Sequence, residues 1–363
     1  MRVVCLSKDQ VAGPGEGEMQ ALKNQWYCAA FGHELKKDAP LARTILNEAV
    51  VMYRRSDGAP VAFEDRCCHR RAPLSLGKVE GDCLRCNYHG FLYDATGKLV
   101  WVPGQDRFPP GSQLRAFPVV EKHGWVWIWM GDPALADATA APSYDKHDDP
   151  AWASYGELIP IKANYFLMVD NLLDLSHLAF LHAPTIGSPE DVTPDLVWER
   201  GERWVKGVRI ARNLSPSPSN LQQGFDCRFD RTQVMLFEPP SNVTIDIIQN
   251  EHGKAYGDPS SRMNRHIVIY DSMTPETDTS CHYFWAIARD YAIDDQGLTA
   301  MLLKGTSAAF HEDKDMLEAE QRIIDLDMDA PQVDVIGDAG GLQARRIVER
   351  MLAEAQDAKV AAE

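Results

Sequence analysis

Short apolar runs separated by turn residues fill the chain from residue 44 to residue 130. Residues 49–55 and 61–63 form two such runs on either side of a Ser-Asp-Gly turn. The run WVWIWM at residues 125–130 has the length and composition of a buried strand. The pattern therefore predicts a small all-β domain, which we place at residues 21–135.

The second half of the chain has a different pattern. A segment rich in Ala, Asp and Pro predicts a linker over residues 136–150. A helix is expected near residues 169–182, and two more close the chain at 302–327 and 341–356. Strands are expected between them, at residues 204–212, 233–237, 243–248, 266–270 and 282–288. This mixture predicts an α+β domain over residues 151–356, with helices packed on one face of a curved antiparallel sheet.

Length and charge narrow the class of protein. With 363 residues the chain is too long for one compact core, which agrees with two domains. Residues 1–20 and 357–363 are expected to be a flexible lead-in and a tail. A net charge of −16 and a pI near 5.1 argue against a nucleic-acid partner. The apolar runs are too short to cross a membrane. Six of the eight cysteines show no regular spacing and fit free thiols in a reducing cytoplasm.

Two short segments, CCH at residues 67–69 and CNYH at residues 86–89, carry the strongest chemical signal. Each offers one thiolate and one imidazole, and 16 residues lie between His69 and Cys86. A Rieske [2Fe–2S] centre needs this set, because two cysteines bind one iron and two histidines bind the other. Zinc sites usually pair like ligands instead. The pattern favours a Rieske centre over zinc, with Cys68 as a packing residue rather than a swapped ligand.

A second candidate metal site lies in the helix expected near residues 169–182. A Rieske cluster moves single electrons and needs an acceptor, and two histidines with one carboxylate form the facial triad of non-haem Fe(II) oxygenases. His177 and His182 are candidates for the two histidines. Residues five apart diverge by about 140° on an ideal helix, so a π-type bulge is expected to bring them together. Two unrelated helix histidines are the alternative, which the Rieske motif disfavours.

The carboxylate of this site is expected from the helix at residues 302–327. Its segment FHEDKDMLE, at residues 310–318, is rich in acids, and most of them should form a solvated helix face. We choose Asp313 as the ligand. Physical reasoning on the sequence does not separate it from Glu312 or Asp315.

These segments resemble the oxygenase component of Rieske non-haem iron oxygenases, nearest to the vanillate O-demethylase-like aromatic monooxygenases. The resemblance covers about residues 22–355 and includes VPGQ at 102–105, WVWIWMGDP at 125–133, DNLLDLSH at 170–177 and DAG at 338–340. It implies a helix-grip fold for the catalytic domain. It also implies one [2Fe–2S] cluster and one mononuclear Fe(II) per chain, with these ligands: Cys67, His69, Cys86 and His89 for the cluster, and His177, His182 and Asp313 for the iron.

The resemblance further implies roles for two residues and an assembly. Asp174 matches a carboxylate that joins the two centres across a subunit boundary, bonding His89 of one subunit and His177 of the next. Asn171 matches an Asn or Asp that lies close to the iron. Family members form rings of three, in which one Rieske domain passes electrons to the neighbouring catalytic domain. We therefore expect a homotrimer.

The activity implied by the resemblance is that of a terminal oxygenase in aromatic compound catabolism. NADH would reduce a separate flavin and iron–sulfur reductase, which would reduce the cluster directly or through a ferredoxin. The chain has no Rossmann fingerprint, so it should bind neither NAD nor flavin itself. One oxygen atom of O2 would enter a small aromatic compound, most simply in oxidative O-demethylation. N-dealkylation, methyl hydroxylation and arene cis-dihydroxylation are alternatives, and an electron carrier or ligand-binding module without mononuclear iron is the non-enzymatic one.

No motif between residues 200 and 290 identifies the substrate. Alternating side chains of the expected strands are candidates for the pocket wall, although most strand aromatics are core residues. The candidates are Met235, Ile247, His266, Tyr283 and Trp285.

Overall fold

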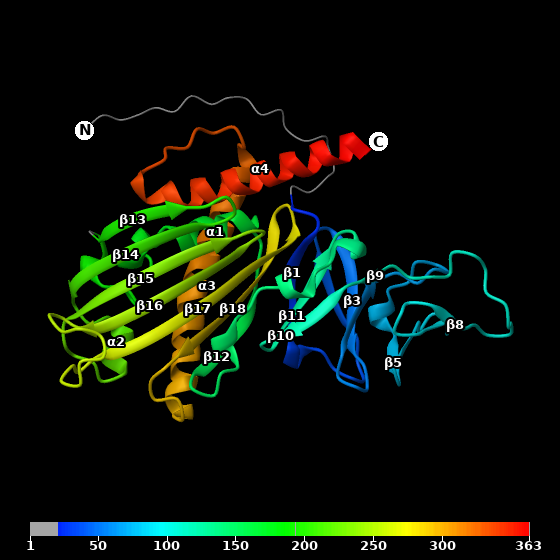
Figure 1. Ribbon diagram of the computed structural model, residues 1–363, viewed down its shortest axis with the longest axis horizontal. Helices are drawn as coiled ribbons and strands as arrows, with labels where there is room; N and C mark the ends of the chain where they lie inside the picture. The colour runs from blue at the N-terminus through cyan, green and yellow to red at the C-terminus, as the bar shows by residue number, and fades with distance from the viewer. Residues whose placement is uncertain (1–20, 193, 363) are drawn as a thin grey trace.

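The computed structural model describes residues 21–192 and 194–362, and it contains two domains that lie side by side (Figure 1). The lead-in expected over residues 1–20 lies outside the described residues. Antiparallel strands build the first domain, as the pattern of short apolar runs predicts. These strands are β1 (Gln25–Phe31), β2 (Leu41–Ile45), β3 (Glu48–Arg54), β4 (Pro60–Glu64), β5 (Lys78–Glu80), β6 (Cys83–Arg85), β7 (Leu92–Tyr93), β8 (Leu99–Trp101), β9 (Ala116–Phe117), β10 (Val119–Lys122) and β11 (Trp125–Met130).

The strands of the first domain form three sheets with different surroundings. The sheet β1-β11-β10 contacts the second domain, and the sheet β5-β6-β7-β8 lies at the far end of the molecule (Figure 1). The sheet β2-β3-β4-β9 lies between them. Side chains alternate along β11, so Val126 and Ile128 enter the core of their own domain while Trp125 and Trp127 face the second domain. The first domain is thus anchored at one end and free at the other.

A seven-stranded antiparallel sheet, in the order β12-β18-β17-β16-β15-β14-β13, forms the second domain. Its strands are β12 (Ala153–Ile161), β13 (Asp195–Arg200), β14 (Val205–Leu214), β15 (Phe229–Glu238), β16 (Asn242–Glu251), β17 (Asn264–Thr277) and β18 (Ser280–Arg289). Its helices are α1 (Tyr165–Leu173), α2 (Pro218–Gln222), α3 (Gln296–Leu326) and α4 (Ala339–Ala362). The predicted α+β arrangement is confirmed, except that α4 continues through the tail expected at residues 357–363 as far as the structure describes it. Among the described residues, no helix combines the length and hydrophobicity that crossing a membrane requires.

The large sheet is covered on both faces because its strands carry two alternating sets of apolar side chains. On β17, Ile267 and Ile269 face the helices, whereas Tyr270 faces the tryptophans of β11. Across the same boundary, the hydroxyl of Thr274 donates a hydrogen bond of 2.6 Å to the carbonyl of Cys28. The two domains of one chain are therefore packed as a single body.

The expected linker, residues 136–150, is part of this boundary. Tyr144 packs edge-on against Trp125, with ring centroids 4.8 Å apart, and stacks on Tyr270 at 4.4 Å. The composition of the segment predicts a linker, and it does not reveal this aromatic anchor. Three short 3-10 helices cover the segment and its start: Pro133–Leu135, Ala138–Ala140 and Asp145–His147.

Candidate active site

Two loops of the first domain share one backbone geometry, and each begins with a cysteine. In each loop the cysteine amide donates to the carbonyl five residues later, at 2.9 Å for Cys67 and 2.8 Å for Cys86. The cysteine carbonyl accepts from the amide four residues later, which belongs to Arg71 or Gly90. These two residues have positive φ values of 59° and 74°, which turn each loop back toward its start. A repeated loop thus presents both ligand segments.

The four expected cluster ligands come together at the end of this domain. The thiols of Cys67 and Cys86 are buried, and burial raises the pKa of the Cys86 thiol, with the neighbouring Cys67 thiol adding to the shift. The rings of His69 and His89 are exposed, with centroids 4.5 Å apart. Among the described residues these four do not bring their ligand atoms within 4.8 Å of one another, as a single zinc ion would require. Buried thiols and exposed imidazoles fit the two ends of a [2Fe–2S] cluster.

Tyr93 is a neighbour of this site that the sequence did not reveal. Its hydroxyl lies 3.2 Å from Sγ of Cys67 and 3.1 Å from Sγ of Cys68. Hydrogen bonds to cluster sulfurs help to set the reduction potential. Cys68 itself is exposed rather than packed, which corrects the expectation. Tyr93 lies on β7, which pairs with β6 next to the second loop, and its hydroxyl reaches across to the cysteines of the first loop.

The helix expected near residues 169–182 is broken. α1 ends at Leu173, and Asp174 has an extended backbone with φ −116° and ψ 94°. The Asp174 carboxylate then caps a 3-10 helix, Leu175–Ala179, by accepting the Ser176 amide at 2.9 Å. The expected π-type bulge is therefore wrong, because a capping aspartate favours a helix start over a helix interior.

Three expected ligands converge after this break. Nε2 of His182 lies 3.0 Å from Oδ1 of Asp313, and Nε2 of His177 lies 3.6 Å from the same oxygen. One ligand atom from each of the three residues lies within 4.8 Å of the others. His177 stands in the 3-10 helix, His182 in the turn after it, and Asp313 on α3. Two imidazoles and one carboxylate with open space beside them form the donor set of non-haem Fe(II) sites.

The second ring nitrogen of each histidine has its own acceptor. Nδ1 of His177 lies 2.7 Å from the carbonyl of Asp174, and Nδ1 of His182 lies 2.7 Å from the carboxylate of Glu312. These acceptors favour the proton on Nδ1 and leave the Nε2 lone pairs for a metal. The hydroxyl of Thr185 also donates to Glu312, at 3.0 Å. Glu312, one of the open choices for the metal ligand, thus orients His182 instead.

Asp174 contacts His177 differently from the expectation. Its carbonyl faces the imidazole, while its carboxylate is used as the cap of the 3-10 helix. The 3-10 helix Ile336–Asp338 lies against this carboxylate, since a Cβ on Gly337 would stand 2.7 Å from Oδ2. The bridge from Asp174 to His89 of a neighbouring subunit stays a prediction.

The carboxylate of the triad is buried, and this favours binding of a cation. Asp313 is 1% exposed, and among the described residues its ion-pair partners are the two histidines rather than Lys or Arg. Burial lowers the pKa of His177, whereas hydrogen bonds to Asp313 and Glu312 outweigh burial and raise the pKa of His182. Asn171 donates to Oδ1 of Asp313 at 3.0 Å, while its own Oδ1 is buried without a partner. A bound Fe(II) would neutralise the buried carboxylate, so these residues fit the ion.

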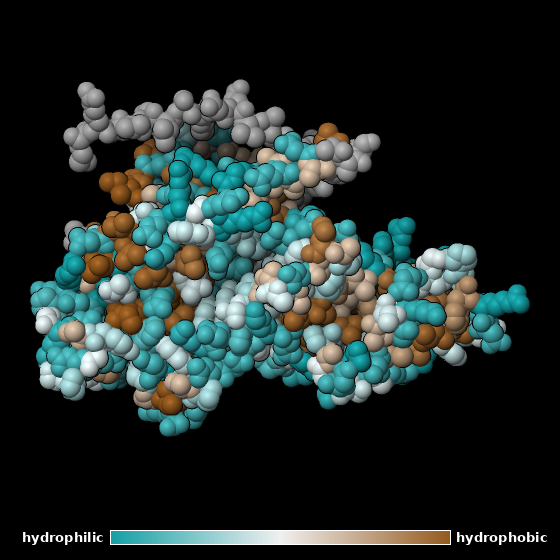
Figure 2. All heavy atoms as spheres, viewed as in Figure 1, coloured by the Kyte–Doolittle hydropathy of each residue, from teal (hydrophilic) through white to brown (hydrophobic). Residues whose placement is uncertain are grey.

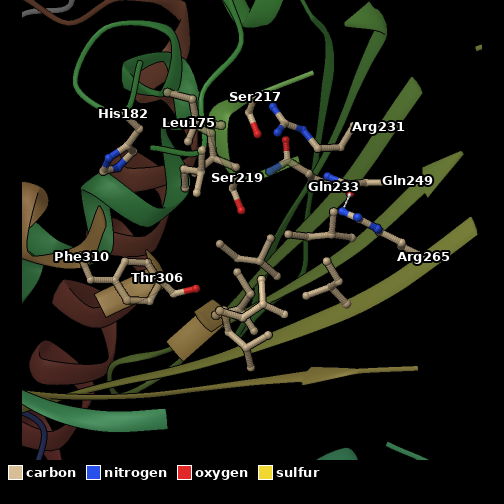
Figure 3. Close-up of a pocket in the computed structure, with 18 of the residues that line it drawn as sticks. Leu175, His182, Ser217, Ser219, Arg231, Gln233, Gln249, Arg265, Thr306 and Phe310 are labelled. Atoms are coloured by element: carbon tan, nitrogen blue, oxygen red, sulfur yellow. Dashed lines mark hydrogen bonds between the residues drawn. The ribbon is translucent and has the colours of Figure 1, made fainter. Parts of the chain in front are cut away.

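Within the second domain, a cavity extends from the triad along strands β15 to β18. Its empty volume, measured with the open mouth included, is about 1040 Å³. Asn171 and Phe310 line it beside the triad. Arg231 and Arg265 line it at the other end, across from His182 (Figure 3). Isoleucines of three adjacent strands form its middle: Ile245, Ile247, Ile267, Ile269 and Ile287.

Of the five side chains expected in the wall, only Ile247 lines this cavity. Tyr283 and Trp285 pack on Phe310, with ring centroids 5.5 and 4.9 Å away, and Met235 joins the same core. The remaining candidate, His266, lies among the side chains of the other face and bonds Asp246 at 2.9 Å.

Comparisons with known proteins cover both domains. Residues 25–118 match the Rieske [2Fe-2S] domain, and residues 161–354 match the Vanillate O-demethylase oxygenase C-terminal domain. A putative toluene-4-sulfonate monooxygenase system iron-sulfur subunit of Comamonas testosteroni is 41% identical over 91% of this chain and 97% of its own length. A vanillate O-demethylase oxygenase subunit of a Pseudomonas species is 39% identical over 85% and 95%.

The comparison with solved structures agrees with these family matches. The crystal structure of dicamba monooxygenase bound to dicamba has a TM-score of 0.84 and 30% identity, covering 92% of this chain and 98% of that chain. The matched segments include the two cysteine loops and the His/His/Asp group. The chain therefore belongs to the Rieske non-haem iron oxygenases, in the group of the vanillate O-demethylase oxygenase subunits, and it is a Rieske-type monooxygenase.

Proposed function

We propose that this protein is the terminal oxygenase of a multicomponent system and removes the methyl group of a small aromatic ether. The observation that carries the proposal is an apolar cavity that begins at His177, His182 and Asp313. Relatives named as O-demethylases of vanillate and of dicamba support the reaction type. Iron on the triad would supply the activation of O2. In the balanced reaction, the ether, O2, two electrons and two protons give a phenol, formaldehyde and water.

The chain's own residues position the substrate and keep water out. The isoleucines in the middle of the cavity offer a rigid apolar slot for a flat ring, because β-branched side chains have few rotamers. Phe310 closes this slot beside Asp313. Asp174 and Glu312 fix the orientation of the two imidazoles, so the open side of the triad faces the cavity. The ether methyl group would occupy that side.

Electrons would come from outside the chain. His69 and His89 are exposed, and Tyr88 beside them is 66% exposed, so a reductase or ferredoxin can reach the cluster loops. We propose an NADH-dependent flavin and iron–sulfur reductase as the source. The free thiols among the described residues agree with a reducing cytoplasm.

A ring of three chains would join the two centres. Within one chain, β5 and β8 mark the cluster end, far from α1 and α3 in Figure 1. Apolar side chains are exposed close to the triad, including Phe180 at 74% and Ile336 at 85%. Figure 2 shows further apolar side chains at the cluster end of the molecule. Exposed apolar patches often mark protein contacts, and this pairing supports a head-to-tail homotrimer.

We expect the purified protein to be red-brown, with about three iron atoms per chain, two in the cluster and one at the triad. Metal analysis and the visible absorption spectrum after anaerobic purification measure this. About two iron atoms would indicate an electron carrier, and a colourless zinc protein would end the Rieske assignment.

Turnover with a surrogate reductase tests the reaction. Methoxybenzoates should consume O2 and yield formaldehyde and the matching phenol in equal amounts, and N-alkyl anilides should yield less. With labelled O2, one oxygen atom should enter the organic products. A diol that carries two labelled atoms, or full iron content without any aryl-ether turnover, would contradict the proposal.

A further inference from the structure

The cavity has a charged end opposite the triad. Figure 3 shows Arg231, Gln233, Gln249 and Arg265 together on the strands, across the cavity from His182. The register places them in a row, since Arg231 on β15 faces Gln249 on β16, which faces Arg265 on β17. Charged groups are almost never fully buried without a partner, so each arginine needs an explanation.

One of the two guanidinium groups has an acid partner within the protein. Arg231 forms an ion pair with the buried Asp191. The same carboxylate also pairs with Arg209 at 3.3 Å, so a single acid serves two arginines. A third arginine of the lining, Arg289, uses its terminal nitrogens on backbone carbonyls and on Thr299.

Arg265, unlike Arg231 and Arg289, has almost no polar partner in the protein. It is 2% exposed, and its one hydrogen bond is a long contact of 3.5 Å from Nη1 to Oε1 of Gln249. Phe225 and Tyr291 lie against the guanidinium, with ring centroids 3.5 and 4.9 Å from Cζ. Nε and Nη2 have no partner, and no carboxylate pairs with Arg265 anywhere in the described chain. Burial lowers the pKa of the Arg265 guanidinium, because it disfavours the charged form.

The two unpaired nitrogens lie on the same edge of the guanidinium. This edge is a fork that can donate two parallel hydrogen bonds to a carboxylate or a similar oxyanion. The chain uses the same edge elsewhere, because Arg345 holds Asp170, and Arg66 holds Glu64, through Nε and Nη2. At Arg265 both nitrogens of this edge lack a protein partner, and the residue lines the cavity. A small side-chain rotation on ligand binding can present the edge to the occupant.

We propose that Arg265 binds the acid group of a monoanionic aromatic substrate, a carboxylate or a sulfonate, whose other end faces the His/His/Asp triad. This inference rests on the proposed function, because it takes the cavity as the substrate site. Gln249 completes the charged end, and the isoleucines hold the ring between the two ends. Neutral aromatics of the same shape would leave the buried charge unpaired, so they should bind more weakly.

Binding without turnover tests the proposal. Titration calorimetry on the iron-loaded protein under nitrogen would compare 4-methoxybenzoate, toluene-4-sulfonate and the neutral 4-methoxybenzamide. At least one acid should bind about 10- to 100-fold more tightly than the amide, the range for a charge-assisted pair. The tighter of the two acids identifies the preferred oxyanion. Equal affinity for the acids and the amide would overturn the inference.

Variants separate a binding role from a structural one. Arg265→Gln should remove the preference for acids, and Arg265→Lys should keep part of it. Both should retain the cluster spectrum. Arg265→Gln should melt no lower than the wild type, because it removes an unpaired buried charge. Arg262→Gln is the matched control, since this arginine is on the same segment with its side chain 61% exposed, and it should change nothing. An unchanged preference in Arg265→Gln, or a lower melting temperature with unchanged affinity, would assign Arg265 to the fold.

The test of acid binding and the test of O-demethylation can fail separately. If no ether is cleaved while acids still bind through Arg265, the proposed O-demethylation fails and the acid site stands. If ethers are cleaved with no preference for acids, the reaction stands and the acid site fails.

Discussion

Replacing Asp313 with alanine should remove the mononuclear iron and bring turnover to background, while the cluster spectrum remains unchanged. The carboxylate completes the set of three ligands, and it lies in the second domain, whereas the cysteine loops belong to the first. Iron content should fall from about three to about two atoms per chain. Full iron content with full activity in Asp313→Ala would show that another residue is the ligand.

Two neighbouring acids provide graded controls for this substitution. Asp315 has a side chain that is 80% exposed, so Asp315→Ala should keep iron and activity. Glu312 orients His182 through Nδ1, so Glu312→Ala should weaken iron binding or activity by about 10- to 100-fold, as other partners of metal-bound histidines do. The order Asp313, Glu312, Asp315 is therefore the expected order of damage.

The Asp174→Asn variant should fold and keep both metals, yet it should reoxidise its cluster about 100-fold more slowly in a single turnover. Asparagine is nearly isosteric and caps helices as well as aspartate, so the hydrogen bond to the Ser176 amide can persist. It lacks the negative charge that would attract an imidazole N–H of a neighbouring subunit. Rapid mixing of the reduced protein with O2 and saturating substrate measures the rate.

Asp137→Asn controls for the capping role. Asp137 also caps a 3-10 helix, with the same 2.9 Å bond to an amide two residues later, but it lies in the linker. If Asp174 were only a cap, both variants would cost about 1 kcal/mol of stability or less and both would transfer electrons normally. A wild-type rate of reoxidation and normal product yield in Asp174→Asn would remove Asp174 from the bridge.

The sequence identified the metal sites best where donor chemistry fixes the residue type. Cysteine and histidine in the CCH and CNYH segments leave few alternatives, and the structure brings these residues together. Asp313 could not be separated from Glu312 by physical reasoning, because that choice depends on a rotation of about 100° between adjacent helix positions. In the structure this rotation places Asp313 at Nε2 of His182 and Glu312 at Nδ1.

Strand ends were harder to predict than strand centres, and the reason bears on function. The expected strands at 233–237, 243–248 and 266–270 are shorter than β15, β16 and β17. Polar residues such as Arg231, Gln249 and Arg265 interrupt the apolar pattern there, so the pattern stops before the strand does. Three residues of the omitted ends, Arg231, Gln249 and Arg265, belong to the charged end of the cavity.

The prediction of the residues in the cavity wall was mostly wrong for a related reason. The alternation of apolar and polar residues shows which face of the sheet a side chain lies on. It does not show where along the strand the helices stop covering that face. Tyr283 and Trp285 are buried together with Phe310, under the helices rather than at the cavity. Tertiary packing, which the sequence does not encode locally, decides between core and wall.

The lining of the cavity also bears on how long the enzyme can survive its own chemistry. The chain contains 12 methionines and 8 cysteines, yet the cavity-lining part of the described chain includes neither residue type. Thioethers and thiols are the side chains that oxidants damage most readily. An oxygenase that reduces O2 without a substrate in place releases oxidants beside its own walls. Aliphatic isoleucines offer them few easy targets, so the pocket should keep its shape through many unproductive cycles.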